Sequence, residues 1–295
     1  MMRNLRSREQ VKNGVCKVFV DEKIFPNTLS VMQTRAAGQG IELVVGRYAD
    51  FEPTSDYFGA IAQLPNADGA IEDYAGWIED CHAAGLKVTI VADLMVMALL
   101  RPIDADIMCG TTQRFGLPMG FGGPTAGYMA TRDEYKRDLP GRIIGLSKDT
   151  YGHPAFRLAL QTREQHIKRE KATSNICTAE ALCAMMAGFY GVYHGAEGIR
   201  EIAEGIHSKT TYLNEMIQAY GYQQENTEFF DTLKITACDN ADWQTQLKEK
   251  AESLGINLYY DPTGWVGISL DETVTLDDMN DLIELFAEAS GNMPQ

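Results

Sequence analysis

The sequence predicts an α/β protein whose large domain contains a mainly parallel sheet, followed by a small α+β domain. Strand-like and helix-like segments alternate through the first half, as expected of right-handed βαβ units. One strand, Val88–Ala92, is apolar throughout, which is typical of a parallel strand covered on both faces. The pattern changes near residue 208, so we place the large domain at residues 1–207 and the small domain at 208–295.

The first half of the chain supplies the elements of the predicted large sheet. One helix is capped by Asn27 or Thr28 and ends near Gly38, and a second has apolar residues at helical spacing and ends at Gly85. A charged helical stretch precedes the first strand, so we expect the large domain to be incomplete at its amino-terminal end. The predicted strands are Lys17–Val20, Ile41–Val45, Tyr57–Leu64, Val88–Ala92, Ile107–Gly110 and Tyr128–Ala130.

A long helix is predicted after residues 132–176, which are polar and poorly periodic. Its apolar residues recur at i, i+3 and i+4, and this spacing predicts one buried face. Two adjacent methionines on that face are typical core-filling residues. The predicted face consists of Leu182, Met185, Met186, Phe189, Tyr190 and Tyr193.

The last part of the chain has the pattern of a small sheet with helices. Asp261-Pro262-Thr263-Gly264 has Asp, Pro and Gly at the positions that a type I turn favours, which predicts a hairpin. Thr275 and Asp278 form a predicted capping box for the final helix, which ends at Gly291. The other predicted elements are the strand Phe229–Ala237, the helix Gln244–Leu254 and the hairpin strands Ile256–Tyr260 and Trp265–Leu270.

Composition indicates a soluble globular protein. Of 295 residues, 45% are hydrophobic and 23% are charged, and the net charge is −15. An acidic surface repels nucleic acid and anionic membranes, so neither is an expected partner. The sequence has no apolar run of about eighteen residues and no secretory signal. The six cysteines are scattered without a CxxC pair, which indicates reduced thiols and no metal or disulfide site.

Asp93 follows the apolar strand directly, at the carboxyl end of the sheet where ligands of open α/β proteins bind. A carboxylate there can bind a cationic ring nitrogen or a metal. It can equally cap a helix over Leu94–Leu100. Spacing alone favours the cap and leaves both interpretations open.

A glycine-rich loop covers residues 110–124. Five glycines and two prolines fix an unusual backbone path, so another chain or a ligand can approach closely. The spacing matches neither a GxGxxG fingerprint nor a P-loop. A tight connection between two strands is the alternative interpretation.

Residues 142–171 form a basic stretch with seven Lys or Arg and three Asp or Glu. Arginine and lysine there can bind carboxylate or phosphate groups, and His166 can exchange protons near neutral pH. A solvated helix face is the more common meaning of such a charge run. Small hydroxyl and amide residues follow at 172–178, before a helix start, and favour anion binding.

Several long strings resemble signature stretches of the glycine cleavage P-protein family, over about residues 15 to 285. The resemblance implies a fold type I pyridoxal-phosphate transferase-like architecture. For the complete enzyme it implies the activity of glycine dehydrogenase (aminomethyl-transferring, decarboxylating). The strings are GTTQRFGLPMGFGGP, PGRIIGLSKDTYG, RLALQTREQHIKREKATSNICTAEALCA, YHGAEGI, FFDTLKI and GISLDETVT.

The resemblance also implies that this chain is the amino-terminal, lysine-lacking half. In the carboxyl-terminal half of the family, the cofactor lysine lies in a His-Lys-Thr-Phe-type loop before a glycine-rich run. Aligning the two loops by their Gly-Pro ends places Gln113 at the lysine position and Thr112 at the histidine position. A carboxamide is no amine nucleophile, so no catalytic residue is expected in this half. Asp93 falls where fold type I enzymes place the partner of the pyridine nitrogen, a role that is vestigial here.

The implied partner is the lysine-bearing half or subunit, which holds pyridoxal 5′-phosphate. Together they decarboxylate glycine and pass the aminomethyl group to lipoylated H-protein, in an oligomer of the cytoplasm or, in a eukaryote, the mitochondrial matrix. This half supports and lines the active site, and we expect the isolated chain to be inactive. The residues expected at the substrate or at the partner half are Arg114, Phe115, Arg163, His166, Arg169, Lys171, Thr173, Ser174 and Asn175.

Three other interpretations remain. The chain is a non-catalytic scaffold or an inactive truncated fragment; it is an independent pyridoxal enzyme that uses another lysine, such as Lys148; or it binds anions or nucleic acid through residues 142–171. The net charge of −15 argues against nucleic acid. Lys148 lies in a polar segment and not at a strand end, which argues against the second.

Overall fold

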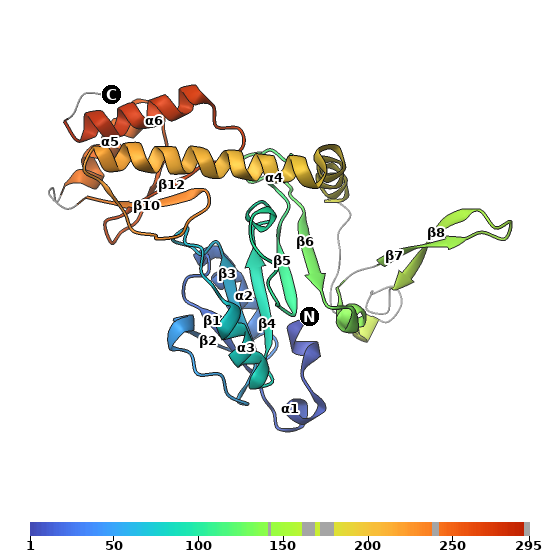
Figure 1. Cartoon of the computed structure of the whole chain (residues 1–295). Coiled ribbons are helices and arrows are strands. Elements are labelled where there is room, and N and C mark those ends of the chain that lie inside the picture. Colours follow the sequence, from blue (N-terminus) through green and yellow to red (C-terminus); the bar gives the residue numbers. More distant parts are fainter. Residues whose placement is uncertain (141–142, 161–168, 172–179, 238–241, 292–295) are drawn as a thin grey trace.

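The computed structural model describes residues 1–140, 143–160, 169–171, 180–237 and 242–291, and its architecture is shown in Figure 1. A six-stranded sheet and a four-stranded sheet form two units. Helix α4 (Ala181–Ala219) runs along both of them (Figure 1). None of the helices in these ranges is long and apolar enough to cross a membrane.

The larger sheet has the strand order β2-β1-β3-β4-β5-β6. All its strands are parallel except β6, which pairs antiparallel with β5. The predicted α/β class and the predicted strands are confirmed, with ends that differ by a residue or two. The strands are β1 (Lys17–Asp21), β2 (Glu42–Gly46), β3 (Tyr57–Leu64), β4 (Lys87–Ala92), β5 (Ile107–Thr111) and β6 (Gly127–Thr131).

Helices cover both faces of this sheet because successive side chains of a strand point to opposite faces. In β1, Val18 and Val20 pack with residues of α2 (Pro26–Ala37). Phe19, between them, packs with residues of α3 (Ala75–Ala83). Burial on both sides explains why the strand at Val88–Ala92 has no polar face.

Helix α2 corrects one predicted boundary. It begins at Pro26, after Phe25 as the N-cap, and not after a cap at Asn27 or Thr28. Proline suits this first helical position because its fixed φ is helical and its missing N–H has no intrahelical acceptor there. The helix ends at Ala37, one residue before Gly38, as expected.

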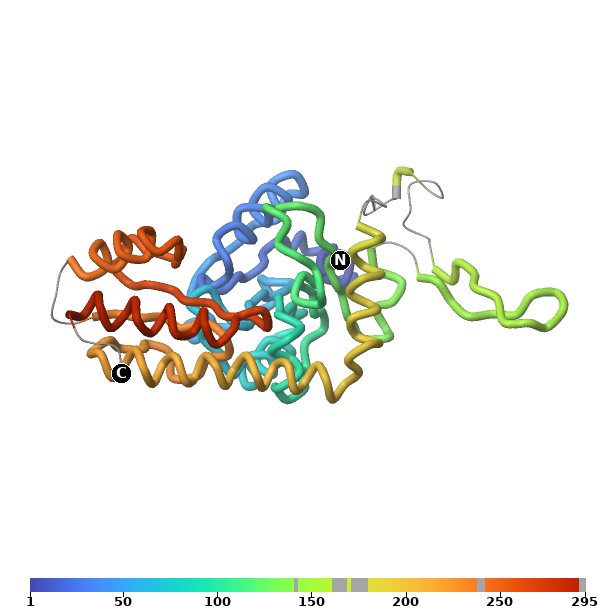
Figure 2. The backbone as a smooth tube through the Cα atoms, turned by 90° about the horizontal axis from the view of Figure 1, so that it is seen from above, coloured from blue at the N-terminus to red at the C-terminus, as the bar shows by residue number. Residues whose placement is uncertain are grey.

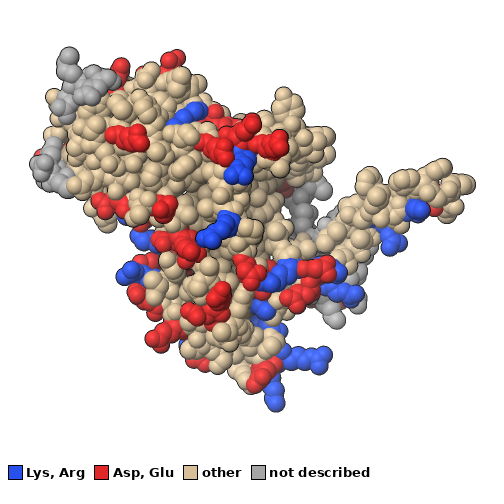
Figure 3. Space-filling view, viewed as in Figure 1, with Lys and Arg blue, Asp and Glu red and all other residues tan. Residues whose placement is uncertain are grey.

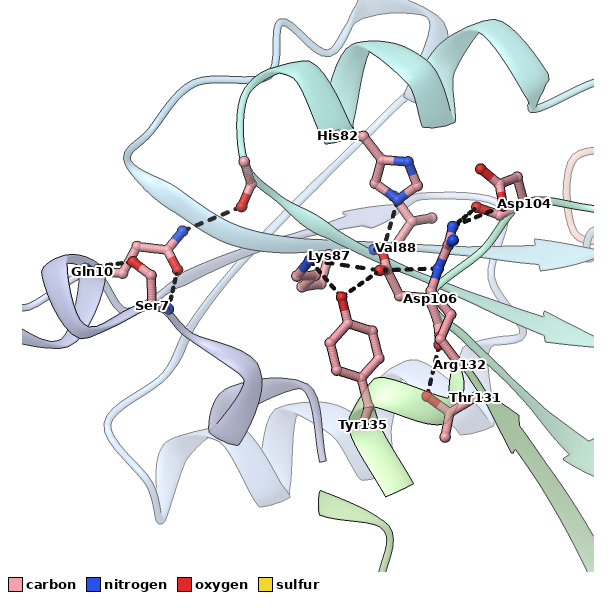
Figure 4. A network of polar contacts seen from close by, with 11 residues as sticks. Ser7, Gln10, His82, Lys87, Val88, Asp104, Asp106, Thr131, Arg132 and Tyr135 are labelled. Carbon is pink, nitrogen blue, oxygen red and sulfur yellow. Dashed lines mark hydrogen bonds and ion pairs between the residues drawn. The ribbon is translucent and has the colours of Figure 1, made fainter. Parts of the chain in front are cut away.

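The amino-terminal segment is helical, as predicted, in η1 (Met2–Leu5) and α1 (Arg8–Lys12). Ser7 and Gln10 cap α1 reciprocally, and the Gln10 side chain reaches the Gly85 carbonyl at 3.5 Å. This segment therefore packs at the start of β4, beside the polar network drawn in Figure 4.

Asp106 is the centre of that network, at the amino ends of β4 and β5 (Figure 4). Its side chain is 3% exposed, and it accepts hydrogen bonds from Val88 N and from His82 Nε2, each at 2.8 Å. Tyr135 Oη lies 3.2 Å from Oδ1, and Lys87 Nζ lies 3.7 Å from the same atom. Tyr135 belongs to η4 (Asp133–Asp138), so the network fixes η4 to the edge of the sheet.

A projecting hairpin lies within residues 132–176, where the sequence predicted no regular element. Strands β7 (Ile143–Lys148) and β8 (Pro154–Leu160) pair antiparallel and extend away from both units (Figures 1 and 2). The turn is closed by a hydrogen bond from Asp149 N to the His153 carbonyl at 2.9 Å. A two-stranded ribbon of this kind is marginally stable unless one of its faces is covered.

Helix α4 is two helical segments that meet at Gly195, whose φ of 64° and ψ of −175° are not helical. The second segment has a buried face, made by Ala203, Ile206, Leu213 and Ile217. The first segment corrects a prediction, because its apolar face lies largely in solvent.

The smaller unit is an antiparallel sheet of order β11-β12-β10-β9, backed by helices that share one apolar core. The predicted turn is confirmed by a hydrogen bond from Gly264 N to the Asp261 carbonyl at 3.0 Å. The capping box of Thr275 and Asp278 is also confirmed. The elements are β9 (Gln223–Gln224), β10 (Thr232–Thr236), α5 (Trp243–Ser253), β11 (Tyr259–Tyr260), β12 (Val266–Ser269) and α6 (Leu276–Ala289).

The described cysteines, Cys16, Cys81, Cys109 and Cys183, are free thiols. Cys81 is buried under the large sheet, and this burial raises the pKa of its thiol to about 12. A thiol so far from ionisation is a weak nucleophile, so Cys81 is a core residue.

Candidate functional site

The candidate site lies at the carboxyl ends of β4 and β5. Asp93 follows β4, and its Oδ1 accepts a hydrogen bond from Met95 N at 2.6 Å. This bond is a local turn between Asp93 and Met95. The single helical turn that follows, η3 (Val96–Ala98), has Met95 at its N-cap and no side-chain cap, where the sequence predicted a helix over residues 94–100. The other oxygen, Oδ2, lies 2.7 Å from Arg114 Nε. Asp93 thus caps no helix, and its carboxylate pairs with an arginine of this chain; a ligand role for Asp93 stays a prediction.

Arg114 bridges to the smaller unit. Its Nη2 donates to Asp231 Oδ2, immediately before β10, and its guanidinium carbon lies 5.8 Å from the centre of the Phe230 ring. The Asp231 side chain is 5% exposed and also accepts a hydrogen bond from Thr232 Oγ1 at 2.9 Å. Burial raises the pKa of Asp231 above its ordinary value, and the charge of Arg114 offsets only part of this rise.

The glycine-rich loop connects β5 and β6, and close packing explains its composition. A Cβ at Gly110 would lie 2.2 Å from the Ala92 carbonyl oxygen and 2.8 Å from the Tyr128 ring. Thr112 closes the loop through hydrogen bonds from its N and Oγ1 to the Ala126 carbonyl, at 2.8 Å and 3.0 Å. The loop is therefore a strand connection, and its close contacts hold Arg114 at the strand end.

Gln113 lies in this loop next to Arg114, partly buried, with its backbone N–H donating to Thr111 Oγ1 at 3.1 Å. Phe115 follows and packs against the Tyr190 ring of α4, 5.2 Å away between ring centres. Tyr190 Oη in turn donates to Glu272 of the smaller unit at 2.6 Å. The loop is thus held from both sides, by α4 and by the smaller unit.

The structure brings together three of the predicted site residues, Asp93, Arg114 and Phe115. Arg169 is exposed on η5 (Arg169–Lys171), and the described residues show no contact between η5 and the Asp93–Arg114 pair. Lys171 is the last residue of η5. The remaining predicted site residues lie outside the described ranges: Arg163, His166, Thr173, Ser174 and Asn175.

The site does not fit pyridoxal phosphate. At the position that the family resemblance aligns with the lysine, Gln113 has a carboxamide and no amine, and Asp93 is already paired with a cation of the chain itself. The alternative lysine, Lys148, corrects a prediction, because it lies at a strand end, that of β7. It is nevertheless exposed on the projecting hairpin and not at the ends of the large sheet. Within the described ranges, His, Cys, Asp and Glu nowhere form a group of three that could hold a metal ion.

Asp231 is the site residue that sequence analysis missed. It was placed inside a predicted strand over Phe229–Ala237, whereas β10 begins only at Thr232. An aspartate in line with the apolar positions Leu233 and Ile235 of an alternating strand pattern was the available signal, because a carboxylate is buried there only with a partner. The partner, Arg114, is distant in sequence, so spacing could not supply it.

Exposed apolar side chains form two further features, on the first segment of α4 and on the hairpin. In α4, Phe189 is 71% exposed and Tyr193 is 85% exposed, although helical spacing predicted a buried face. In the hairpin, Leu146 pairs with Phe156, and they are 72% and 81% exposed. Much of the hairpin surface in Figure 3 is neither acidic nor basic. The exposed apolar residues of these two features are Ile144, Leu146, Phe156, Leu158, Leu182, Met185, Met186, Phe189, Val192 and Tyr193.

Sequence comparison identifies relatives along nearly the whole chain. The family model described as "Glycine cleavage system P-protein" matches residues 3–286. The chain is 55% identical to a glycine dehydrogenase (decarboxylating) of Bacteroides thetaiotaomicron over 294 residues, which are 99% of this chain and 31% of that protein. It is 50% identical to that of a Nostoc species over 279 residues, 94% of this chain and 28% of that protein. The chain therefore spans about a third of the length of these curated relatives.

Structural comparison agrees with the sequence. A crystal structure of glycine decarboxylase (P-protein) of the glycine cleavage system, in inhibitor-bound form, has a TM-score of 0.85 and 28% identity, covering 95% of this chain and 67% of that one. Mouse CSAD in apo form has a TM-score of 0.68 at 14% identity, covering 98% and 68%, and shares the fold. These likenesses confirm the expected fold type I architecture of pyridoxal-phosphate enzymes. With a family model matched over residues 3–286, this chain belongs to the glycine cleavage system P-protein family.

Proposed function

We propose that this chain is the lysine-lacking half of a glycine decarboxylase and that it works only together with a lysine-bearing half. The second half would hold pyridoxal phosphate, which supplies the electron sink for loss of carbon dioxide from glycine. The aminomethyl group would pass to lipoylated H-protein. In this chain, the residues at the strand ends hold the loop around Arg114 in place and carry out no bond-making step.

The observation that carries the proposal is the exposed apolar face of α4. A helix face with Leu182, Phe189 and Tyr193 in solvent is unusual in a protein that works alone, because contiguous exposed apolar surface marks an interaction site. The curated relatives are about three times longer than this chain, so they contain the additional polypeptide that could cover this face. The hairpin also carries exposed apolar side chains. It projects at the end of the molecule where α4 begins (Figures 1 and 2).

The basic residues of 163–171 have a separate role in this proposal. Arg163, His166, Arg169 and Lys171 would attract the glycine carboxylate or an acidic H-protein surface. Alanine at Arg163 or Lys171 in the complete enzyme is then expected to raise the Michaelis constant for glycine or for H-protein. Unchanged constants in both variants would contradict this allocation.

A second candidate function is a non-catalytic scaffold, and the pairing of Arg114 with both Asp93 and Asp231 favours it. At the strand ends, Asp93 is already paired with a cation of this chain before any ligand arrives. The scaffold predicts that charge changes at Arg169 and Lys171 alter assembly but not turnover of the assembled enzyme. The two functions are thus separated by one kinetic comparison.

The central experiment replaces Phe189 by serine in the complete protein. We expect carbon dioxide release from glycine, with lipoylated H-protein present, to fall by about tenfold or more, because a central interface aromatic is often worth about 2 kcal/mol. Leu254→Ser is the matched control: it removes another exposed apolar side chain, 52% exposed, beyond α5 at the opposite end of the molecule (Figure 1). Equal activity of both variants and the parent protein would overturn the proposal.

A further inference from the structure

Two groups of three charged side chains join the smaller unit to the larger sheet. The first places Arg114 between Asp93 of the larger unit and Asp231 of the smaller one. All three side chains are largely removed from solvent, with 22%, 23% and 5% exposure for Asp93, Arg114 and Asp231. Water screens such ion pairs less than it screens pairs on the surface.

The second group has the opposite charge pattern. Asp68 of the larger unit lies between Lys23 and Lys234, and the Lys234 Nζ of β10 is 3.0 Å from its Oδ2. Asn226 Nδ2 also donates to the Asp68 carbonyl at 2.7 Å. Burial raises the pKa of Asp68, but hydrogen bonds and charges from the two lysines outweigh it, so the pKa lies below its ordinary value. Charged groups therefore join the units at two places, in addition to the backbone hydrogen bond from Ile71 N to the Glu228 carbonyl at 3.0 Å.

The first group is built around a single cation that cannot be lost without leaving two acids. Two carboxylates that converge repel each other when both are ionised, and a cation between them relieves this repulsion without protonation of either acid. A guanidinium meets this need well because its planar fork can donate to two carboxylates at once and it never deprotonates. Its third nitrogen, Nη1, is buried and has no hydrogen-bond partner among the described residues.

We propose that Arg114 is a built-in cation that stands opposite Asp93 in the place of the cofactor ring, and that it clamps the smaller unit to the larger sheet. The strand-end acid is thereby neutralised from within the chain. The loop over residues 110–124, which would carry the lysine, then connects the two units through Arg114. The clamp concerns contacts within this chain and is independent of the proposed function, whereas the replacement of the cofactor ring rests on this chain being the lysine-lacking half.

Hydrogen exchange in the complete protein tests the clamp. In Arg114→Met and in Asp231→Asn, we expect amides of Phe229–Thr236 to exchange about tenfold faster or more, while β1 is unchanged. The effects should be coupled, so the double variant exchanges no faster than the more affected single one. Arg200→Met is the control, since Arg200 makes an exposed pair with Glu204 on α4 and its loss should leave both segments unchanged.

Asp231→Asn keeps the Arg114–Asp93 pair, so it tests the clamp even where Arg114→Met does not fold. Parent-like exchange of Phe229–Thr236 in the folded Asp231→Asn protein would overturn the clamp. So would fully additive effects in the double variant.

Cofactor stoichiometry tests the replacement. Gln113→Lys supplies the missing amine but leaves the cation, so bound pyridoxal phosphate per complete polypeptide should stay at the parent value. Gln113→Lys with Arg114→Thr should gain about one equivalent, because Asp93 is then free to pair with the ring. Binding of additional pyridoxal phosphate by Gln113→Lys alone, or no additional binding by the double variant, would overturn the proposal that Arg114 replaces the cofactor ring opposite Asp93.

Discussion

Asp106 organises the amino ends of the strands, as Arg114 organises their carboxyl ends. Burial raises the pKa of Asp106, but hydrogen bonds from Val88 and His82 and the charge of Lys87 outweigh it. The net pKa lies below the ordinary value of 3.8. The folded state therefore favours the ionised carboxylate. Its contribution to stability is complete above pH 3.8 and is lost as the pH falls below that value.

Replacing Asp106 by asparagine should lower the free energy of unfolding by about 2 kcal/mol at pH 7, because the amide cannot accept all of these hydrogen bonds. The difference from the parent protein should shrink as the pH falls below 3.8, where the parent carboxylate protonates. Thermal unfolding across pH measures both. Asp133→Asn is the control, since that side chain is 86% exposed and its pair with Lys136 should contribute little. An Asp106 variant with the same pH profile as the parent would contradict this account.

Sequence reasoning located site residues that directly follow a predicted strand. It missed contacts between residues that are distant in sequence and close only in the folded chain. Asp93 could be placed because the end of a buried apolar strand is readable from its composition. The pair of Arg114 and Asp231 could not be predicted, because these two residues are 117 positions apart in the sequence. The Gln113 prediction rested on a family loop and not on geometry, and the roles given to Arg163 and His166 stay predictions.

Among the elements, α4 separates two kinds of apolar surface. Helical spacing predicted an apolar face correctly but could not say what covers it. Beyond Gly195 the face is covered by this chain, as the buried Ile206 and Leu213 show. Before Gly195 it is not. The hairpin was missed for a related reason: Ile144 and Leu146 alternate with small residues, yet the flanking charges hid this period of two.

Gly195→Ala tests whether the break in α4 is fixed by backbone conformation. No described atom lies within 4 Å of a Cβ built at Gly195, so the expected loss of about 1–3 kcal/mol in unfolding free energy comes from the φ of 64° with extended ψ. Gly205→Ala is the matched control, in the regular second segment with equal space around it. That change should stabilise the protein by about 0.5–1 kcal/mol. Urea denaturation distinguishes them, and equal effects of the two changes would contradict the account.

At the scale of the whole molecule, the two units pack together and the β7–β8 hairpin projects from them (Figure 2). Four exposed apolar residues of its two strands share one face, since Ile144 lies opposite Leu158 and Leu146 opposite Phe156. Exposed apolar ribbons tend to associate with one another. The domain boundary near residue 208 stays a prediction. Residue 208 lies inside α4 (Ala181–Ala219), which runs along both units.

The chain on its own should therefore self-associate in solution. Replacing both Leu146 and Phe156 by serine is expected to weaken this association by about tenfold or more, equivalent to about 1.4 kcal/mol. Sedimentation velocity over a concentration series measures the change. Leu276→Ser is the control, as its side chain is 76% exposed on α6, away from the hairpin. A parent chain that sediments as a monomer at all concentrations would contradict the prediction.

The break at Gly195 also decides how mutational data on this protein would divide. A library screened for folding of the 295-residue chain would tolerate polar replacements at Phe189 and Tyr193, which lie in solvent. The same library, placed in the complete enzyme and selected for cell growth that depends on its activity, would reject these replacements. After Gly195 the two screens would agree. The positions at which they differ would therefore end at this glycine, between the two segments of α4.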